Sequence, residues 1–334
     1  LKDDSVKLRA MKYLSFIGCC YLLCSLLNVA LAEQTAYLRS ATAEGTQYTF
    51  AWLDHDSRPR KISFLLPDAS SRHLPVQQVN YNPQLALRAV EIELLKAARD
   101  IDPREARFKL INRHDSLAFG LSGKNEKRLD ELTTELKETQ ETALNDYLTE
   151  RYFQHYQTPL LQKAIKPNHI RYIEESTLPL TPLAQSLYDI VDEQSNARSY
   201  LNLLLSWAQT IPYDELTNRV SSNGSGFSPP LAVLNQNLGD CDSKSVLTAS
   251  LIRAFLPNNS MRLVLLRNHA LLAIAMTPLT KDTTMMIDGM PFILLDPTGP
   301  AQMKLGEVSK STKQAIASQQ YTLEVIPPAA ARQQ

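Results

Sequence analysis

Residues 239–255 read GDCDSKSVLTASLIRAF, and this stretch decides the fold. Gly239 permits a sharp turn of the backbone, and Asp240 belongs to the residue types that cap helices. Apolar and small residues then recur at helical spacing. The stretch therefore predicts a helix over Cys241–Phe255 that begins at the cysteine itself.

A cysteine in the first turn of a helix faces free backbone N–H groups and the positive end of the helix dipole. Both features lower the pKa of a thiol below its ordinary value of about 8.5, and the same N–H groups can stabilise an oxyanion. The flanking Asp240 and Asp242 oppose this effect. We therefore expect a cationic imidazole beside Cys241 that holds the thiolate.

Two later residues are placed to complete such a site. His269 opens the apolar run 269–276, and Asp296 closes the apolar run 292–295 before Pro297. Neighbouring antiparallel strands can bring this histidine beside this aspartate, which would orient the imidazole so that it deprotonates the thiol. The predicted distances are about 4 Å from the sulfur to one ring nitrogen and about 2.6–3.2 Å from the carboxylate to the other.

Three motifs in this order, GDCDSKSVLTASLIRAF, VLLRNHALLAIAM and FILLDPTG, closely resemble the core of the transglutaminase-like superfamily. The upstream segment LSWAQTIPY (205–213) is similar to the helix and turn that precede the nucleophile in bacterial members. The resemblance covers about residues 180–300. It implies a catalytic Cys241–His269–Asp296 triad on a papain-like core.

The resemblance also implies acyl-transfer chemistry, in which a thiolate attacks a carboxamide and water or an amine resolves the thioester. Many bacterial members look like peptidases or amidases. The group that binds the oxyanion stays open, because papain-like enzymes use a glutamine before the cysteine and animal transglutaminases use an upstream tryptophan. The candidates are Gln236, Trp207 and Gln209.

The hydropathy pattern predicts an α+β fold. Alternating apolar residues in 48–52 and 62–66 indicate a hairpin with one buried face, and helices are expected over 84–100 and 125–157. Further helices are expected over 182–193, 197–209, 231–237 and 307–318, and strands over 106–111, 261–267, 269–276, 291–295 and 322–326. Asp288-Gly289 is a hairpin turn signal. We expect a transglutaminase-like domain over 176–334, with the nucleophile helix packed on an antiparallel sheet, after an N-terminal β-plus-helical region over 33–175.

Residues 1–32 are expected to comprise upstream residues and a signal peptide. Lys12 follows Met11, the next 17 residues are largely apolar, and Ala30-Leu31-Ala32 matches a cleavage site. Alternatives are an uncleaved membrane anchor or a lipoprotein acylated at Cys19. Cleavage would yield a periplasmic or secreted protein that meets a membrane only if the segment stays in place.

The composition argues against several functions. Lys+Arg and Asp+Glu both number 35, so nothing indicates a nucleic-acid partner. The chain has six scattered histidines and no Cys or His pair at ligand spacing, so we expect no metal and no other cofactor. Three of the four cysteines lie in the signal segment, which leaves Cys241 without a disulfide partner.

These observations favour an exported cysteine hydrolase that acts on peptide or amide bonds of a peptide or protein substrate. The alternatives are a true transglutaminase and a non-catalytic binding or assembly factor that retains the fold. The sequence leaves open the substrate, the choice between hydrolysis and transamidation, the activity of the triad, the role of 33–175 and the oligomeric state.

Overall fold

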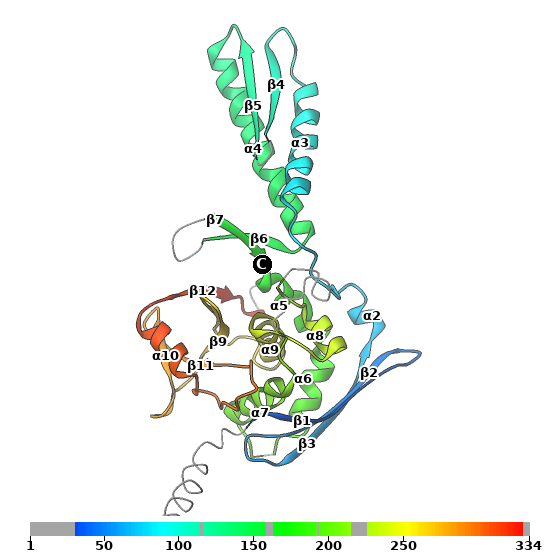
Figure 1. Ribbon diagram of the computed structural model, residues 1–334, viewed down its shortest axis with the longest axis vertical. Coiled ribbons are helices and arrows are strands. Elements are labelled where there is room, and N and C mark those ends of the chain that lie inside the picture. Colours follow the sequence, from blue (N-terminus) through cyan, green and yellow to red (C-terminus); the bar gives the residue numbers. More distant parts are fainter. Residues whose placement is uncertain (1–30, 114–115, 158–162, 193, 215–225, 330–334) are drawn as a thin grey trace, which may run out of the picture.

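The computed structural model describes residues 31–113, 116–157, 163–192, 194–214 and 226–329. It has a mixed α+β architecture with antiparallel sheets, as predicted (Figure 1). The predicted signal segment lies outside these residues, apart from Leu31 and Ala32. No helix within the described ranges has the length and apolar character needed to cross a membrane.

The largest sheet has five antiparallel strands in the order β10-β11-β9-β8-β12. Its strands are β8 (Met261–Leu266), β9 (Ala270–Ala275), β10 (Thr284–Ile287), β11 (Met290–Leu295) and β12 (Tyr321–Ile326). Asp288 and Gly289 form the turn between β10 and β11, and both have positive φ (51° and 78°). A turn with two positive φ angles suits this residue pair, so the predicted hairpin turn is confirmed.

Side chains alternate between the two faces of this sheet, and each face has its own core. Leu263, Leu272 and Ile293 point into the large core that the helices cover. Val264, Leu271 and Phe292 point to the opposite face, where residues of the C-terminal segment cover them. The helices are α5 (His169–Thr177), α6 (Thr181–Tyr188), α7 (Ala197–Thr210), α8 (Pro230–Gln236), α9 (Cys241–Phe255) and α10 (Lys310–Ala317).

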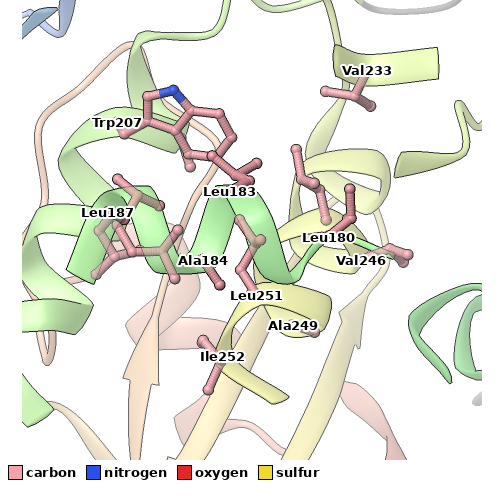
Figure 2. Close-up of a cluster of buried hydrophobic side chains, with 14 of the residues drawn as sticks. Leu180, Leu183, Ala184, Leu187, Trp207, Val233, Val246, Ala249, Leu251 and Ile252 are labelled. Atoms are coloured by element: carbon pink, nitrogen blue, oxygen red, sulfur yellow. The ribbon is translucent and has the colours of Figure 1, made fainter. Parts of the chain in front are cut away.

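The helix that the opening motif predicts is confirmed as α9, with both ends where they were expected. Every residue from Cys241 to Arg253 except Asp242 is buried. This helix packs against α5, α6, α7, α8 and β9. It is therefore the centre of the large core, and Figure 2 shows side chains of α6 and α7 gathered around its residues Leu251 and Ile252.

A separate three-stranded sheet precedes this core, formed by β1 (Glu33–Ala41), β2 (Gly45–Leu53) and β3 (Pro59–Pro67). Its predicted buried face is confirmed, with all six alternating residues at most 5% exposed: Tyr48, Phe50, Trp52, Ile62, Phe64 and Leu66. This face packs on α6 and α7. Phe50 meets Trp207 edge to face at 5.3 Å, and the Trp52 indole donates to Ser206 Oγ at 3.0 Å.

The division expected at residue 175 does not coincide with a break in the core. Residue 175 falls inside α5, and one hydrophobic cluster contains Tyr48, Phe64, Trp207 and Leu251. Residues 33–67 therefore cover the same core as the helices that carry the candidate site, although they lie in a sheet of their own.

The segment between these parts forms an arm that stands away from the rest (Figure 1). It contains α3 (Pro83–Arg99), the hairpin of β4 (Ala106–Arg113) and β5 (Ser116–Gly123), and α4 (Glu126–Glu150), with the short α2 (Asp68–Ser71) before it. The helix expected over 125–157 ends earlier, because Tyr152 adopts φ 59°. The chain then continues as β6 (Phe153–Gln157), which pairs with β7 (Lys163–Pro167).

Candidate functional site

Cys241 is the first residue of α9, and Asp240 is its N-cap. The Asp240 carboxylate accepts a hydrogen bond from Ser243 N at 2.9 Å, which satisfies one of the free N–H groups of the first turn. Ser243 Oγ in turn accepts from Ser228 N at 2.8 Å, so the incoming loop is tied to the same turn. The predicted position of Cys241 at the start of a helix is therefore confirmed.

The sheet brings His269 and Asp296 together. His269 ends the tight turn between β8 and β9, where its carbonyl accepts from Leu266 N at 2.8 Å. Asp296 directly follows β11, the neighbour of β9. The His269 Nε2 atom lies 2.7 Å from Asp296 Oδ2, within the predicted range. This contact leaves Nδ1 as the ring nitrogen that can exchange a proton with another group.

Each of the two groups stabilises the charged form of the other. Burial lowers the pKa of His269, but the hydrogen bond and the charge of Asp296 outweigh burial, and the pKa is raised. Burial alone would raise the pKa of Asp296. The hydrogen bond from His269 outweighs burial, and the pKa is lowered. Thr298 N adds a second bond to the carboxylate, at 3.0 Å.

Replacing Asp296 with asparagine is expected to reduce stability most between about pH 4 and 6.5. The raised pKa of His269 contributes stability below the ordinary value of 6.5, and this is lost as the pH rises through the folded-state value. The lowered pKa of Asp296 contributes above the ordinary value of 3.8. Denaturant unfolding at pH 5 and pH 9 should show the larger loss of unfolding free energy at pH 5. The difference should be about 1.4 kcal/mol for each unit by which Asp296 raises the pKa of His269. Asp288→Asn, at a highly exposed carboxylate, is the control, and equal losses at the two pH values would contradict the assignment.

The thiol is hydrogen-bonded to a group other than the expected imidazole. Among the described residues, its hydrogen bond goes to Asp242 Oδ1 at 3.4 Å and not to His269. The Ala270 backbone N–H also interacts with the sulfur, which places Cys241 against the start of β9, next to His269. The residue is only 8% exposed, so the expectation of a thiol open to a cleft is also wrong.

The direction of the thiol pKa is the opposite of the predicted one. Burial raises the pKa of Cys241, and the carboxylates of Asp242 and Asp240 raise it further. The sulfur and one oxygen of each aspartate lie within 4.8 Å of one another, and burial raises the pKa of Asp240 itself to about 7. Tertiary burial and these two neighbours outweigh the helix N-terminus on which the prediction was based.

This trio of Asp240, Cys241 and Asp242 is also the one cluster among the described residues whose donor atoms could hold a metal ion. The sequence predicts no metal, and thiolates and carboxylates do bind cations. An ion held there would occupy the sulfur and compete with acyl chemistry. That the protein needs no metal or other cofactor stays a prediction.

The structure excludes two of the three oxyanion candidates and keeps the third. Trp207 is fully buried in the large core and cannot reach a substrate. The Gln209 amide is used within the protein: its Nε2 donates to the Asp296 and Met303 carbonyls, and its Oε1 accepts from Met303 N. Both predictions are corrected for these reasons. Gln236 ends α8 with an exposed side chain, so it stays a candidate.

Gln209 instead supports the loop that carries Asp296. Gly299 in that loop has φ +65°, and a Cβ atom there would clash with the backbone of Gln209. Replacing Gly299 with alanine is therefore expected to cost at least about 2 kcal/mol of unfolding free energy, measured by denaturant titration. The matched control is Gly120→Ala, where an added Cβ meets open space. A loss no larger than that of the control would contradict this reading.

The structure adds two residues that the sequence analysis did not single out, Lys244 and His169, and it gives Asp242 a direct contact with the thiol. Lys244 is buried and donates to the backbone carbonyls of Ile211 and Thr298; burial lowers its pKa to about 7. The Asp242 carboxylate accepts a hydrogen bond from the thiol, and the buried His169 imidazole lies 3.8 Å from the other oxygen of that carboxylate. Lys244 could have been suspected from its place on a buried helix. The role of His169 depends on contacts that are remote in sequence.

A cleft of about 440 Å³ opens beside His269 and Asp296. The turn residues Arg267 and Asn268 line it, together with hydroxyl groups near the start of α10. Cys241 does not line this cleft. A substrate that enters it would therefore meet the imidazole before the sulfur.

Comparison with protein-family models, with curated proteins and with solved structures finds no match to this chain.

Proposed function

We propose that the protein is an exported cysteine hydrolase that cleaves peptide or amide bonds through a thioester on Cys241. The observation that carries the proposal is the 2.7 Å contact between His269 and Asp296, beside a cysteine that opens a helix. A buried carboxylate that orients a histidine next to a thiol at a helix N-terminus is the arrangement that cysteine hydrolases need. Support for a papain-like core comes from α9 packing on β9, where Ser245 Oγ donates to the Ala270 carbonyl at 3.2 Å.

In the proposed reaction, the Cys241 side chain turns from Asp242 to His269 Nδ1, which takes the thiol proton. The thiolate attacks the carbonyl carbon, and backbone N–H groups at the start of α9 bind the oxyanion. His269 returns the proton to the leaving amine as the thioester forms. His269 then takes a proton from water, whose oxygen attacks the thioester and releases the acid and the thiol.

A non-catalytic binding or assembly factor is the second candidate. The observation that favours it is the resting state of Cys241, which is 8% exposed and bonded to Asp242. The arm formed by α3, β4, β5 and α4 could serve a partner in either case. A true transglutaminase would use the same thioester and differ only in the group that resolves it.

The test is a search for new peptide termini. Wild-type protein and Cys241→Ala are incubated with a peptide library from a digested proteome, and new amino termini are identified by mass spectrometry. The proposal expects termini that only the wild type generates. A biotinylated primary amine in a parallel reaction would mark glutamine side chains if the protein is a transglutaminase. Identical termini from both proteins, with no amine incorporated, would favour the binding factor.

A further inference from the structure

We infer that His169 is a positioning residue that holds Asp242 against the Cys241 thiol, so that Asp242 keeps the thiol in a resting state bonded to its carboxylate and not to His269. The inference rests on the proposed function in so far as Cys241 is the nucleophile. It concerns a part of the site that the Cys241–His269–Asp296 reaction does not use.

Asp242 lies between two groups. Its Oδ1 accepts the hydrogen bond of the thiol at 3.4 Å, and its Oδ2 lies 3.8 Å from His169 Nε2. The Asp242 side chain is 32% exposed, whereas the imidazole is 2% exposed. Solvent is therefore available to this carboxylate, and some contact on its other side has to keep it turned toward the sulfur.

The surroundings of His169 determine which nitrogen carries the proton. Lys166 Nζ lies 3.3 Å from Nδ1, and Glu324 holds the same ammonium at 2.6 Å. An ammonium group can only donate, so Nδ1 is the acceptor and the proton of the neutral ring is on Nε2. Burial and the charge of Lys166 hold the pKa of His169 well below its ordinary value, so the ring is neutral.

The Nε2–H group has no hydrogen-bond partner among the described residues. A buried donor left without a partner is unfavourable, and the carboxylate that faces it is Asp242. An approach of about 1 Å would complete a normal hydrogen bond. Phe227 packs on the ring with centroids 4.8 Å apart, so His169 cannot turn away easily. These contacts direct the donor to Asp242 Oδ2.

The other charged groups near Asp242 act in both directions. Burial raises its pKa, whereas the hydrogen bond from Cys241 and the charges of Lys166 and His269 lower it, and Glu324 raises it. An Asp240 carboxylate oxygen lies within 4.8 Å of the sulfur and of an Asp242 oxygen. Of these groups, His169 is the neutral donor that can fix the orientation of the carboxylate without adding charge to the site.

The test measures ionisation of the thiol, which requires no substrate. Iodoacetamide alkylation of the full chain is followed from pH 6 to 11, with modification of Cys241 quantified on its own peptide. Asp242→Asn should lower the apparent pKa by about one unit, which is about tenfold faster alkylation below the pKa. His169→Phe should move the pKa in the same direction, because Asp242 is then free to turn to solvent. His169→Gln, which keeps an N–H donor, should stay close to wild type.

The double variant separates positioning from a general structural effect. If His169 acts through Asp242, then His169→Phe changes nothing further in the Asp242→Asn background. His155→Phe, on the exposed surface of β6, is the matched control. An unchanged thiol in His169→Phe, or an effect of equal size in the Asp242→Asn background, would overturn the inference.

A second measurement covers the case in which His169→Phe does not fold. Nitrogen-15 NMR of the imidazole in the wild type should show a neutral ring protonated on Nε2, with a shift of Nε2 in Asp242→Asn. A ring protonated on Nδ1, or one that ignores Asp242→Asn, would overturn the inference. If the variants alter alkylation of Cys241 but the wild type cleaves no amide, the inference stands and the proposed function fails. If the wild type cleaves amides but the variants leave alkylation unaltered, the proposed function stands and the inference fails.

Discussion

His269→Ala is expected to lower the rate of amide cleavage by about 10³-fold, the usual contribution of a general acid–base catalyst. Without the imidazole, the carboxylates of Asp240 and Asp242 remain beside the thiol, and their charges oppose formation of a thiolate. The measurement is the initial rate on a peptide identified from the library, at several pH values. Cys241→Ala should lose the activity altogether.

The control for this prediction is His155→Ala, because His155 is exposed on β6 and distant in sequence from the site. Circular dichroism should show that both histidine variants keep the wild-type fold, since the His269 side chain is 25% exposed and belongs to neither core of the sheet. A His269→Ala rate within about tenfold of wild type would mean that the His269–Asp296 pair is structural.

Trp52→Ala is expected to cost about 3–5 kcal/mol of unfolding free energy, the usual cost of removing a large buried aromatic side chain. The Trp52 side chain is 1% exposed, and its loss also leaves Ser206 Oγ of α7 without the indole donor. Denaturant unfolding measures the effect. Leu38→Ala on the exposed side of β1, at 65% exposure, is the control and should be nearly neutral.

Denaturant unfolding followed by tryptophan fluorescence also tests whether residues 33–67 belong to the core of the candidate site. The chain has two tryptophans, one in β2 and one in α7. Trp52→Phe and Trp207→Phe each leave a single fluorescent reporter, on opposite sides of the contact between sheet and helix. Coincident transitions in the two variants indicate one cooperative unit. Two separate transitions would restore a domain boundary between these elements.

The resting thiol connects these results with the choice between the two candidate functions. A protonated, buried cysteine resists oxidation, because the thiolate is the reactive form. Under the proposed function, it also means that the reactivity of the thiol has to be released when a substrate arrives. The contact between Asp242 and Cys241 accounts for both properties, and it can be broken by one change of side-chain orientation.

Local patterns determined much of the fold. The start of α9 at Cys241 follows from Asp240 and the residues after it, since capping acts within one turn. The hairpin at Asp288-Gly289 follows from the positive φ angles that the two residues accept. The alternation in β2 and β3 predicted the buried face of the N-terminal sheet. His269 and Asp296 could be paired from sequence because each stands at the end of an apolar strand.

Tertiary structure alone decided the rest, because these features depend on groups that are distant in the sequence. Pairing with β6 makes residues 165–167 the end of β7, and Asn168 then caps α5. The chain folds His169 and Lys166 against Asp242, and no local pattern marks that contact. Burial then reverses the predicted shift of the Cys241 pKa, since desolvation of a thiolate beside two carboxylates outweighs the local effect of a helix N-terminus.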